Sequence, residues 1–107
     1  MKYEETVRKI CGDDWRNTPY DERIGGLGVA CVVAFLKGIK PNLEEMSRHL
    51  NVHPDDLDLP FSRLYRHGAF THWNLKKDKA LLGAASEVDA QIAWCHVAAT
   101  ASGFIGV

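Results

Sequence analysis

Apolar residues recur every three to four positions along most of the chain, the spacing of amphipathic helices, and glycine and proline divide this pattern into segments. A first helix is expected over residues 2–10 and ends at Gly12. The second helix is expected to take Thr18 as its N-cap and Pro19 as its first residue, and to run to about Lys37. These segments predict a mainly helical fold.

Two shorter helices are expected to follow, joined by a sharp turn. Asn42 is the expected N-cap of the first, with a glutamate three residues later as in a capping box, and Asn51 tolerates the left-handed backbone of a tight turn. The next helix is expected to begin at Pro54 and to end at Gly68. Pro60 lies inside this segment and predicts either a kinked helix or a second start, two alternatives that the pattern leaves open.

The helix expected to end near Lys37 is apolar nearly all round, which favours a place at the centre of a small bundle. Gly26, Ala30 and Ala34 recur every four residues and leave one face almost without side chains. Glycine inside a helix costs about 1 kcal/mol relative to alanine, which is offset where another backbone packs closely. We therefore expect a second helix on this face. A phosphate-binding loop is rejected, because no Lys-Ser or Lys-Thr pair follows the glycines.

The last helix is expected from Ser86 to about Ser102, with Gly103 as its C-terminal cap, and few of its positions are polar. A small domain rarely buries such a helix on all sides. We expect one face of this helix to pack in the core and another to form a homodimer interface. The expected interface residues are Val88, Ile92, Trp94, Cys95 and Ala99.

The length of 107 residues and the hydrophobic share of 46% are those of one globular domain that spans residues 1–107. The longest uncharged stretch of the first half, residues 24–36, contains three glycines and is too short for a membrane span. The N-terminus lacks the apolar run of a signal peptide, and the three cysteines form no Cys-x-x-Cys pair. We therefore expect a cytoplasmic protein without membrane contact.

Residues 42–68 resemble a helix-turn-helix, with the turn at Asn51 and regularly spaced apolar residues: Leu43, Met46, Leu50, Val52, Leu57, Phe61 and Leu64. Residues 63–70 are similar to the passage from recognition helix to wing in winged-helix regulators. This resemblance to the winged helix-turn-helix superfamily, of the multidrug-resistance-regulator type, implies a two-stranded β-hairpin wing within residues 69–83. It also implies a dimer-forming helix over residues 86–102 and a mainly α bundle that acts as a DNA-associated transcription regulator.

The net charge of −1 gives no overall attraction to a polyanion, but residues 62–79 hold five basic side chains and one acidic side chain. Aromatic residues are interleaved with these charges. Phosphate contacts from such side chains are independent of sequence and sensitive to salt. The sequence thus predicts binding of double-stranded DNA by Arg63, Arg66, Lys76, Lys77 and Lys79. The alternative is a solvated basic surface above aromatic core residues.

A second function is also consistent with the sequence. Asp55, Asp56 and Asp58 stand at the start of the expected recognition helix, where they would repel phosphates. These acids and the near-neutral charge favour a protein-interaction module that uses the same helical fold without nucleic acid. Its contact surface would be this acidic turn and the aromatic stretch of residues 65–73.

No group of residues indicates an enzyme. His49 and His53 have the spacing of helical metal ligands, but the turn between them and the lack of further ligands favour capping and surface roles. Cys95 and His96 are neighbours on a helix, so their side chains point about 100° apart and cannot form a catalytic dyad. We expect Cys95 to be an inert, mostly apolar side chain. The sequence predicts no catalytic residue, no metal site and no cofactor.

Overall fold

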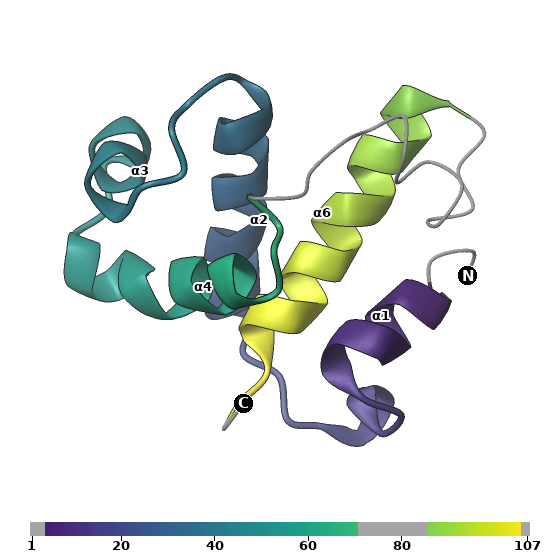
Figure 1. Ribbon diagram of the computed structural model, residues 1–107. Coiled ribbons are helices and arrows are strands. Elements are labelled where there is room, and N and C mark those ends of the chain that lie inside the picture. The colour runs from purple at the N-terminus through teal and green to yellow at the C-terminus, as the bar shows by residue number, and fades with distance from the viewer. Residues whose placement is uncertain (1–3, 71–85, 106–107) are drawn as a thin grey trace.

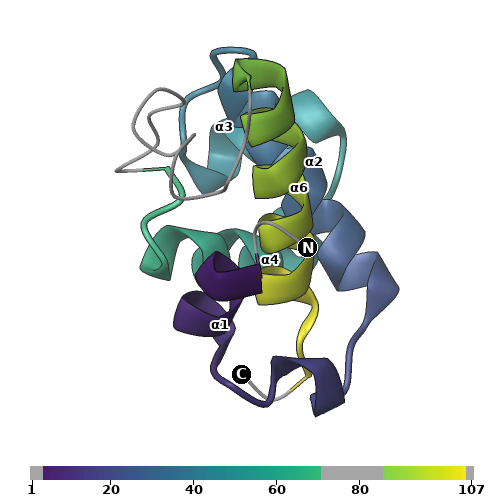
Figure 2. The same ribbon diagram turned by 90° about the vertical axis from the view of Figure 1, so that its right-hand side faces the viewer.

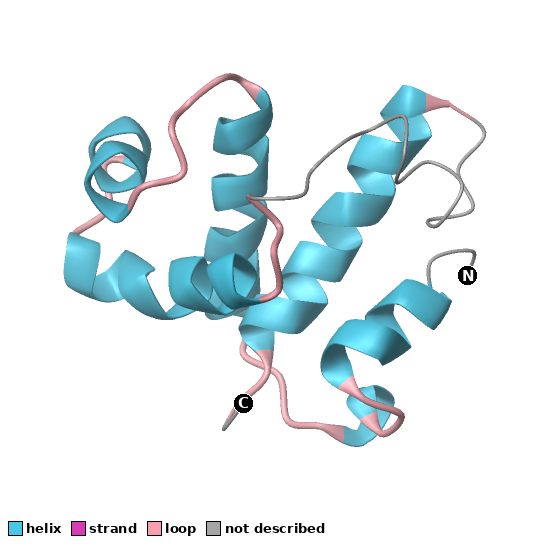
Figure 3. Cartoon of the chain, in the orientation of Figure 1, coloured by secondary structure: helices cyan, strands magenta, loops and turns pink. Residues whose placement is uncertain are grey.

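The computed structural model describes residues 4–70 and 86–105, and over these ranges the chain is helical with no β-strand (Figure 3). Its elements are α1 (Glu4–Cys11), a short 3-10 turn (Trp15–Asn17), α2 (Glu22–Leu36), α3 (Leu43–Leu50), α4 (Pro54–Arg66) and α6 (Glu87–Gly103). The predicted small helical bundle is therefore confirmed. The hairpin wing predicted within residues 69–83 lies outside the described residues, apart from Ala69 and Phe70.

The start of α2 differs from the sequence-based prediction. Its N-cap is Asp21 and not Thr18, since the Asp21 carboxylate accepts hydrogen bonds from the backbone N–H groups of Arg23 and Ile24. The residues before it pair with the end of α6 instead of extending the helix. The Asp21 N–H donates to the carbonyl of Gly103 at 2.6 Å, and Tyr20 forms an isolated antiparallel bridge with Phe104. Backbone pairing with the C-terminal segment thus delays the helix by about one turn.

The predicted ends of α1, α2 and α3 are confirmed, whereas the predicted cap of α6 is wrong, because Gly103 is the last residue of that helix and Phe104 is its C-cap. Gly12 and Gly38 follow α1 and α2 with φ angles of 93° and 95°, and Asn51 ends α3 with a φ of 53°. The expected cap before α3 is also present, because the Asn42 side chain accepts a hydrogen bond from the Glu45 N–H at 2.9 Å. Local capping chemistry therefore sets most of the boundaries of this bundle.

Replacing Asn42 with alanine is expected to lower the free energy of unfolding by about 1 kcal/mol, the usual contribution of an N-cap side chain. Urea unfolding followed by far-ultraviolet circular dichroism measures the change. Asn17→Ala is the matched control, because Asn17 is exposed and caps no helix. An Asn42→Ala midpoint equal to that of the control would contradict this role.

Pro60 does not divide α4, which is one helix from Pro54 to Arg66. The Pro60 ring is fully buried, as are Leu57 and Leu64 on the same side of the helix. Burial of this ring in the core offsets part of the cost of proline inside a helix. Of the two alternatives that the sequence left open, the second start is thus excluded.

α2 and α6 lie at the centre of the bundle and run in opposite directions (Figures 1 and 2). α4 packs against both of them, α1 packs on α6, and α3 packs on α4. The buried side of α6 carries Ala90, Trp94, Val97 and Ala101. Phe70 closes the core next to α4, with its ring centroid 5.3 Å from that of Phe61.

The close contact between α2 and α6 is made by other glycines than the sequence predicted. A Cβ atom at Gly28 would overlap the Ser102 hydroxyl, and one at Gly25 would lie 3.0 Å from the carbonyl oxygen of Ala99. Gly26, by contrast, is exposed, and a Cβ atom added there would meet no atom from the rest of the described chain within 4 Å. The predicted close packing therefore does not occur at Gly26 among the described residues, whereas Ala34 of the same predicted face is buried in the core. The reason is that a helix apolar all round offers more than one face with small residues.

Candidate functional site

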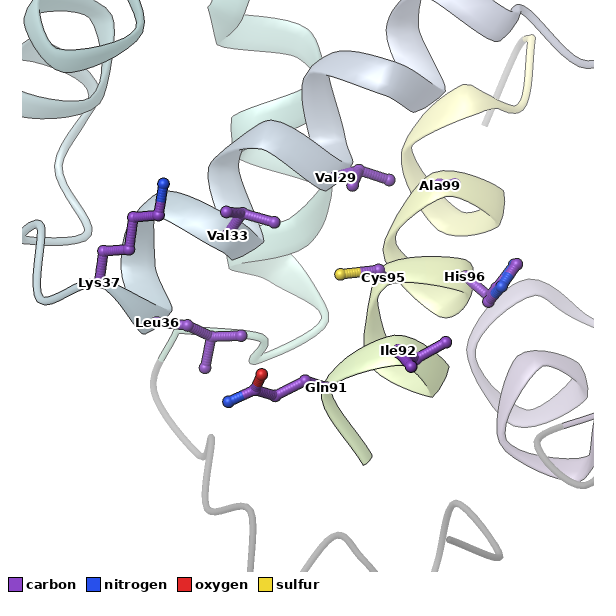
Figure 4. Close-up of a pocket in the computed structure, with 9 residues that line it drawn as sticks. All are labelled: Val29, Val33, Leu36, Lys37, Gln91, Ile92, Cys95, His96 and Ala99. Atoms are coloured by element: carbon purple, nitrogen blue, oxygen red, sulfur yellow. The ribbon is translucent and has the colours of Figure 1, made fainter. Parts of the chain in front are cut away.

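A groove of about 630 Å³ lies between α2 and α6 (Figure 4). Its walls come from the second half of α2 and from the middle of α6, and most of them are apolar. The lining residues are Val29, Val33, Leu36, Lys37, Gln91, Ile92, Cys95, His96 and Ala99. This volume lies in the range of clefts that hold ligands or the side chains of a protein partner.

The groove follows from the way in which the two helices meet. Gly25 and Gly28 bring the backbone of α2 against the last turns of α6, so that the helices touch at this end. Toward the other end larger side chains replace glycine, and Figure 1 shows the C-terminal end of α2 well separated from the start of α6. Helices in contact at one end and apart at the other leave a wedge between them. The groove occupies this wedge.

Each wall of the groove is an apolar stripe with helical spacing. Val29, Val33 and Leu36 follow one another at intervals of four and three residues along α2. On α6 the apolar positions repeat at intervals of four, three and four, and they are Val88, Ile92, Cys95 and Ala99. Val88 is 64% exposed and Ile92 is 53% exposed, although both are apolar. The groove therefore has one strongly apolar, solvent-exposed border along α6.

Polar groups stand at the borders of the groove and not along its floor. In Figure 4 the Cys95 sulfur points toward the α2 wall, whereas His96 points away from it. Lys37, at the end of α2, and Gln91 lie at the wide end. Such an arrangement suits an apolar ligand surface with polar groups only at its margin.

The cysteines in and around the core have the properties of buried apolar residues. Burial raises the pKa of the Cys95 thiol above its ordinary value, that of Cys11 to about 11, and that of Cys31 to about 12. The thiolate is the nucleophilic form of cysteine, and a raised pKa lowers its population at neutral pH. Cys95 therefore contributes an apolar wall to the groove.

Four of the five residues expected in a dimer interface lie on the outward side of α6 or along the groove: Val88, Ile92, Cys95 and Ala99. Trp94 does not, since it is only 8% exposed and belongs to the core of its own chain. Its position two residues after Ile92 turns it by about 200° around the helix axis, toward the core.

The structure also separates the residues expected to bind nucleic acid. Arg63 is only 4% exposed, and its Nη1 donates a hydrogen bond of 2.6 Å to the carbonyl oxygen of Ser102 at the end of α6. Arg66 is exposed on the last turn of α4. The remaining three, Lys76, Lys77 and Lys79, lie outside the described residues. Arg63 therefore joins α4 to α6 and is not placed beside Arg66 on a basic surface.

The sequence does carry a signal for the burial of Arg63, although a charged side chain ordinarily favours the surface. Arg63 follows Pro60 by three residues and precedes Leu64, and both of these are fully buried. Position 63 thus lies on the apolar side of α4. A long arginine side chain can occupy such a position when its head finds a carbonyl acceptor.

The acidic start of α4 and the aromatic residues after it are partly as expected. Asp55, Asp56 and Asp58 are all exposed. Tyr65 is exposed on the same helix, whereas Phe70 is buried and the stretch beyond it lies outside the described residues. Exposure alone therefore leaves Phe70 out of the predicted contact surface and keeps Tyr65 and the three aspartates accessible.

His53 has the capping role that was expected of it, because its Nδ1 accepts a hydrogen bond from the Asp55 N–H at 3.1 Å. Among the described residues no three histidine, cysteine or carboxylate side chains come together as metal ligands. In the same part of the chain, no helix has both the length and the apolar character that crossing a bilayer demands.

Comparison with known proteins found no matching protein family, no similar curated protein and no similar solved structure.

Proposed function

We propose that this protein is a non-enzymatic interaction module that holds an apolar helix of a protein partner in the groove between α2 and α6. The observation that carries the proposal is the groove itself, with two apolar walls and an exposed border at Val88 and Ile92. Exposed apolar surface of this kind is a common mark of a protein contact. Burying it against a partner is favourable by about 25 cal/mol per Å² of apolar surface.

A helix fits the groove better than an extended segment. The α2 wall runs over residues 29–36, a separation of about 10 Å or two helical turns. A partner helix offers apolar side chains at the same intervals of three and four residues, so its ridge can interdigitate with both walls. No sheet edge is present in the described chain to receive a strand.

Two further observations favour binding over catalysis. Burial keeps the three thiols protonated at neutral pH, including that of Cys95 in the groove, because it raises the pKa of each. The side chains that reach the groove are mostly apolar, with only Lys37, Gln91 and His96 at its borders. General acid-base or nucleophilic chemistry depends on ionisable groups that converge on one point. The walls of the groove carry mostly apolar side chains instead.

Nucleic-acid binding of winged-helix type remains a second hypothesis with less support. Of its five predicted contact residues, Arg63 is occupied with Ser102, and the three lysines lie outside the described residues. The exposed carboxylates at the start of α4 are unfavourable to a phosphate chain. The interaction module is therefore the function that the described geometry favours.

Site-specific photo-crosslinking tests the proposal. A benzophenone amino acid replaces Ile92 at the groove and, in a control protein, Tyr65 on α4, two positions that are 53% and 52% exposed. In extracts of the cells that make the protein, we expect the Ile92 probe to form a covalent adduct with a polypeptide and the Tyr65 probe to form far less. Peptide mapping should place the adduct in a segment with helical apolar spacing. Equal yields at both positions, or none at Ile92, would refute the proposal.

A further inference from the structure

We infer that the helix held in the groove is α6 of a second copy of this chain, so that the protein is a symmetric dimer. This inference rests on the function proposed above and names its partner. It is carried by three features of one face of the molecule: a ridge beside the groove, opposite charges at one end, and an uncovered glycine.

The ridge and the groove lie side by side, which is the requirement for self-association. Val88 and Ile92 project from α6 directly beside the groove, whose other wall is Val33 and Leu36 of α2. In a two-fold contact the same patch serves both copies, so the ridge of each must meet the groove of the other. A surface that contains both elements next to each other satisfies this condition.

The charges at the wide end of the groove determine how the two copies are oriented relative to each other. Lys37 at the end of α2 and Asp89 in the first turn of α6 are both exposed. Figure 1 shows the C-terminal end of α2 and the start of α6 at the same end of this antiparallel helix pair. A two-fold axis parallel to the groove places α6 of each copy over α2 of the other. It also keeps the wide ends of the two grooves at the same end of the dimer. Lys37 of each copy then faces the partner's Asp89. Opposite charges of this kind select the register of a contact more than its strength.

Gly26 supplies an independent reason for a second helix. It lies inside α2 on the exposed side, and a methyl group at its Cα would meet no atom of the other described elements within 4 Å. No other described part of the chain packs on this glycine, so it weakens the helix relative to alanine without a packing contact that offsets the cost. Gly25 and Gly28, which do have a packing reason, show how α6 approaches the α2 backbone closely. The partner's α6 would use Gly26 in the same way from the outer side.

Sedimentation equilibrium over the micromolar range tests the association directly. The wild-type chain of 12.0 kDa is expected to sediment with twice that mass. Ile92→Glu should sediment as a monomer with an unchanged circular dichroism spectrum, whereas Tyr65→Glu, at a position of equal exposure, should remain a dimer. A monomeric wild type, or an Ile92→Glu variant that is as dimeric as the control, would overturn the inference.

Charge reversal tests the arrangement of the two copies. Lys37→Asp and Asp89→Lys are each expected to weaken the dimer several-fold, and the double variant should restore the wild-type dissociation constant. Gly26→Ala is expected to weaken the dimer about tenfold, which corresponds to about 1.4 kcal/mol, while it raises the urea midpoint of the monomeric Ile92→Glu protein. A double charge variant no tighter than the singles, or a Gly26→Ala dimer as tight as wild type, would contradict this arrangement.

The crosslinking experiment at Ile92 separates this inference from the proposed function. An adduct of twice the chain mass, joined between two copies at α2 or α6, supports both. An adduct with a different polypeptide overturns the dimer and leaves the interaction module standing. The absence of any adduct overturns both.

Discussion

Gly28→Ala is expected to lower the free energy of unfolding by about 2–4 kcal/mol, because it adds a methyl group where α2 and α6 are in contact. The added Cβ would overlap Ser102 Oγ and lie 3.1 Å from the carbonyl oxygen of Ala98. The Ser102 side chain has little freedom to move, since it is fully buried and its hydroxyl donates to that same carbonyl. The two helices would therefore have to separate at the end where they now touch.

Gly26→Ala is the matched control, two residues away in the same helix. Outside its own helix, no described atom lies within 4 Å of the methyl group that it adds, so in the monomeric Ile92→Glu background it should stabilise the chain by about 0.5–1 kcal/mol. Urea titration of both glycine variants in that background gives the comparison. A Gly28→Ala protein as stable as Gly26→Ala would show that α2 does not meet α6 through Gly28.

Arg63→Ala is expected to cost about 3 kcal/mol of unfolding free energy. The substitution removes a buried side chain and leaves the carbonyl oxygen of Ser102 without its 2.6 Å hydrogen bond. Arg66→Ala, on the exposed side of the same helix, should change stability by less than about 0.5 kcal/mol. Thermal unfolding of the two variants measures the difference.

This pair of variants also separates two roles for the arginines of α4. An arginine that contacts phosphate from the surface has little effect on the stability of the free protein. If Arg63→Ala and Arg66→Ala were equally stable, the link between α4 and α6 would be refuted, and Arg63 would again be available to a polyanion.

The sequence was most informative where structure depends on neighbouring residues alone. The cap at Asn42, the left-handed turn at Asn51 and the glycines after α1 and α2 were all predicted at the right positions. Each of these features depends on the side chain or the backbone freedom of one residue and its immediate neighbours. The one misplaced start, at α2, depends on backbone pairing with a segment more than 80 residues away in sequence.

The candidate site was predicted only in part, because it depends on how two helices meet. The stripe of Val88, Ile92, Cys95 and Ala99 follows from helical spacing, and the structure places it along the groove. The groove itself results from the packing of Gly28 against α6, and the spacing of small residues had pointed to Gly26 instead. On a helix that is apolar all round, periodicity does not tell which face meets which partner.

The burial of Arg63 was missed for a related reason. Its charge suggested a surface position, although its place near Pro60 and Leu64 on the apolar side of α4 favoured burial. The carbonyl acceptor on α6 could not be predicted from the sequence. The sequence shows that residue 63 carries a charge. Whether its long side chain can be buried depends on a hydrogen-bond acceptor that a distant helix contributes.

α2 and α6 touch through Gly28 and then separate to form the apolar groove. A nuclear Overhauser spectrum of the Ile92→Glu protein tests this contact most directly. We expect cross-peaks from the Gly28 Hα protons to the Hβ protons of Ser102. A spectrum in which Gly28 shows no contact with α6, and Gly26 shows such contacts instead, would contradict it.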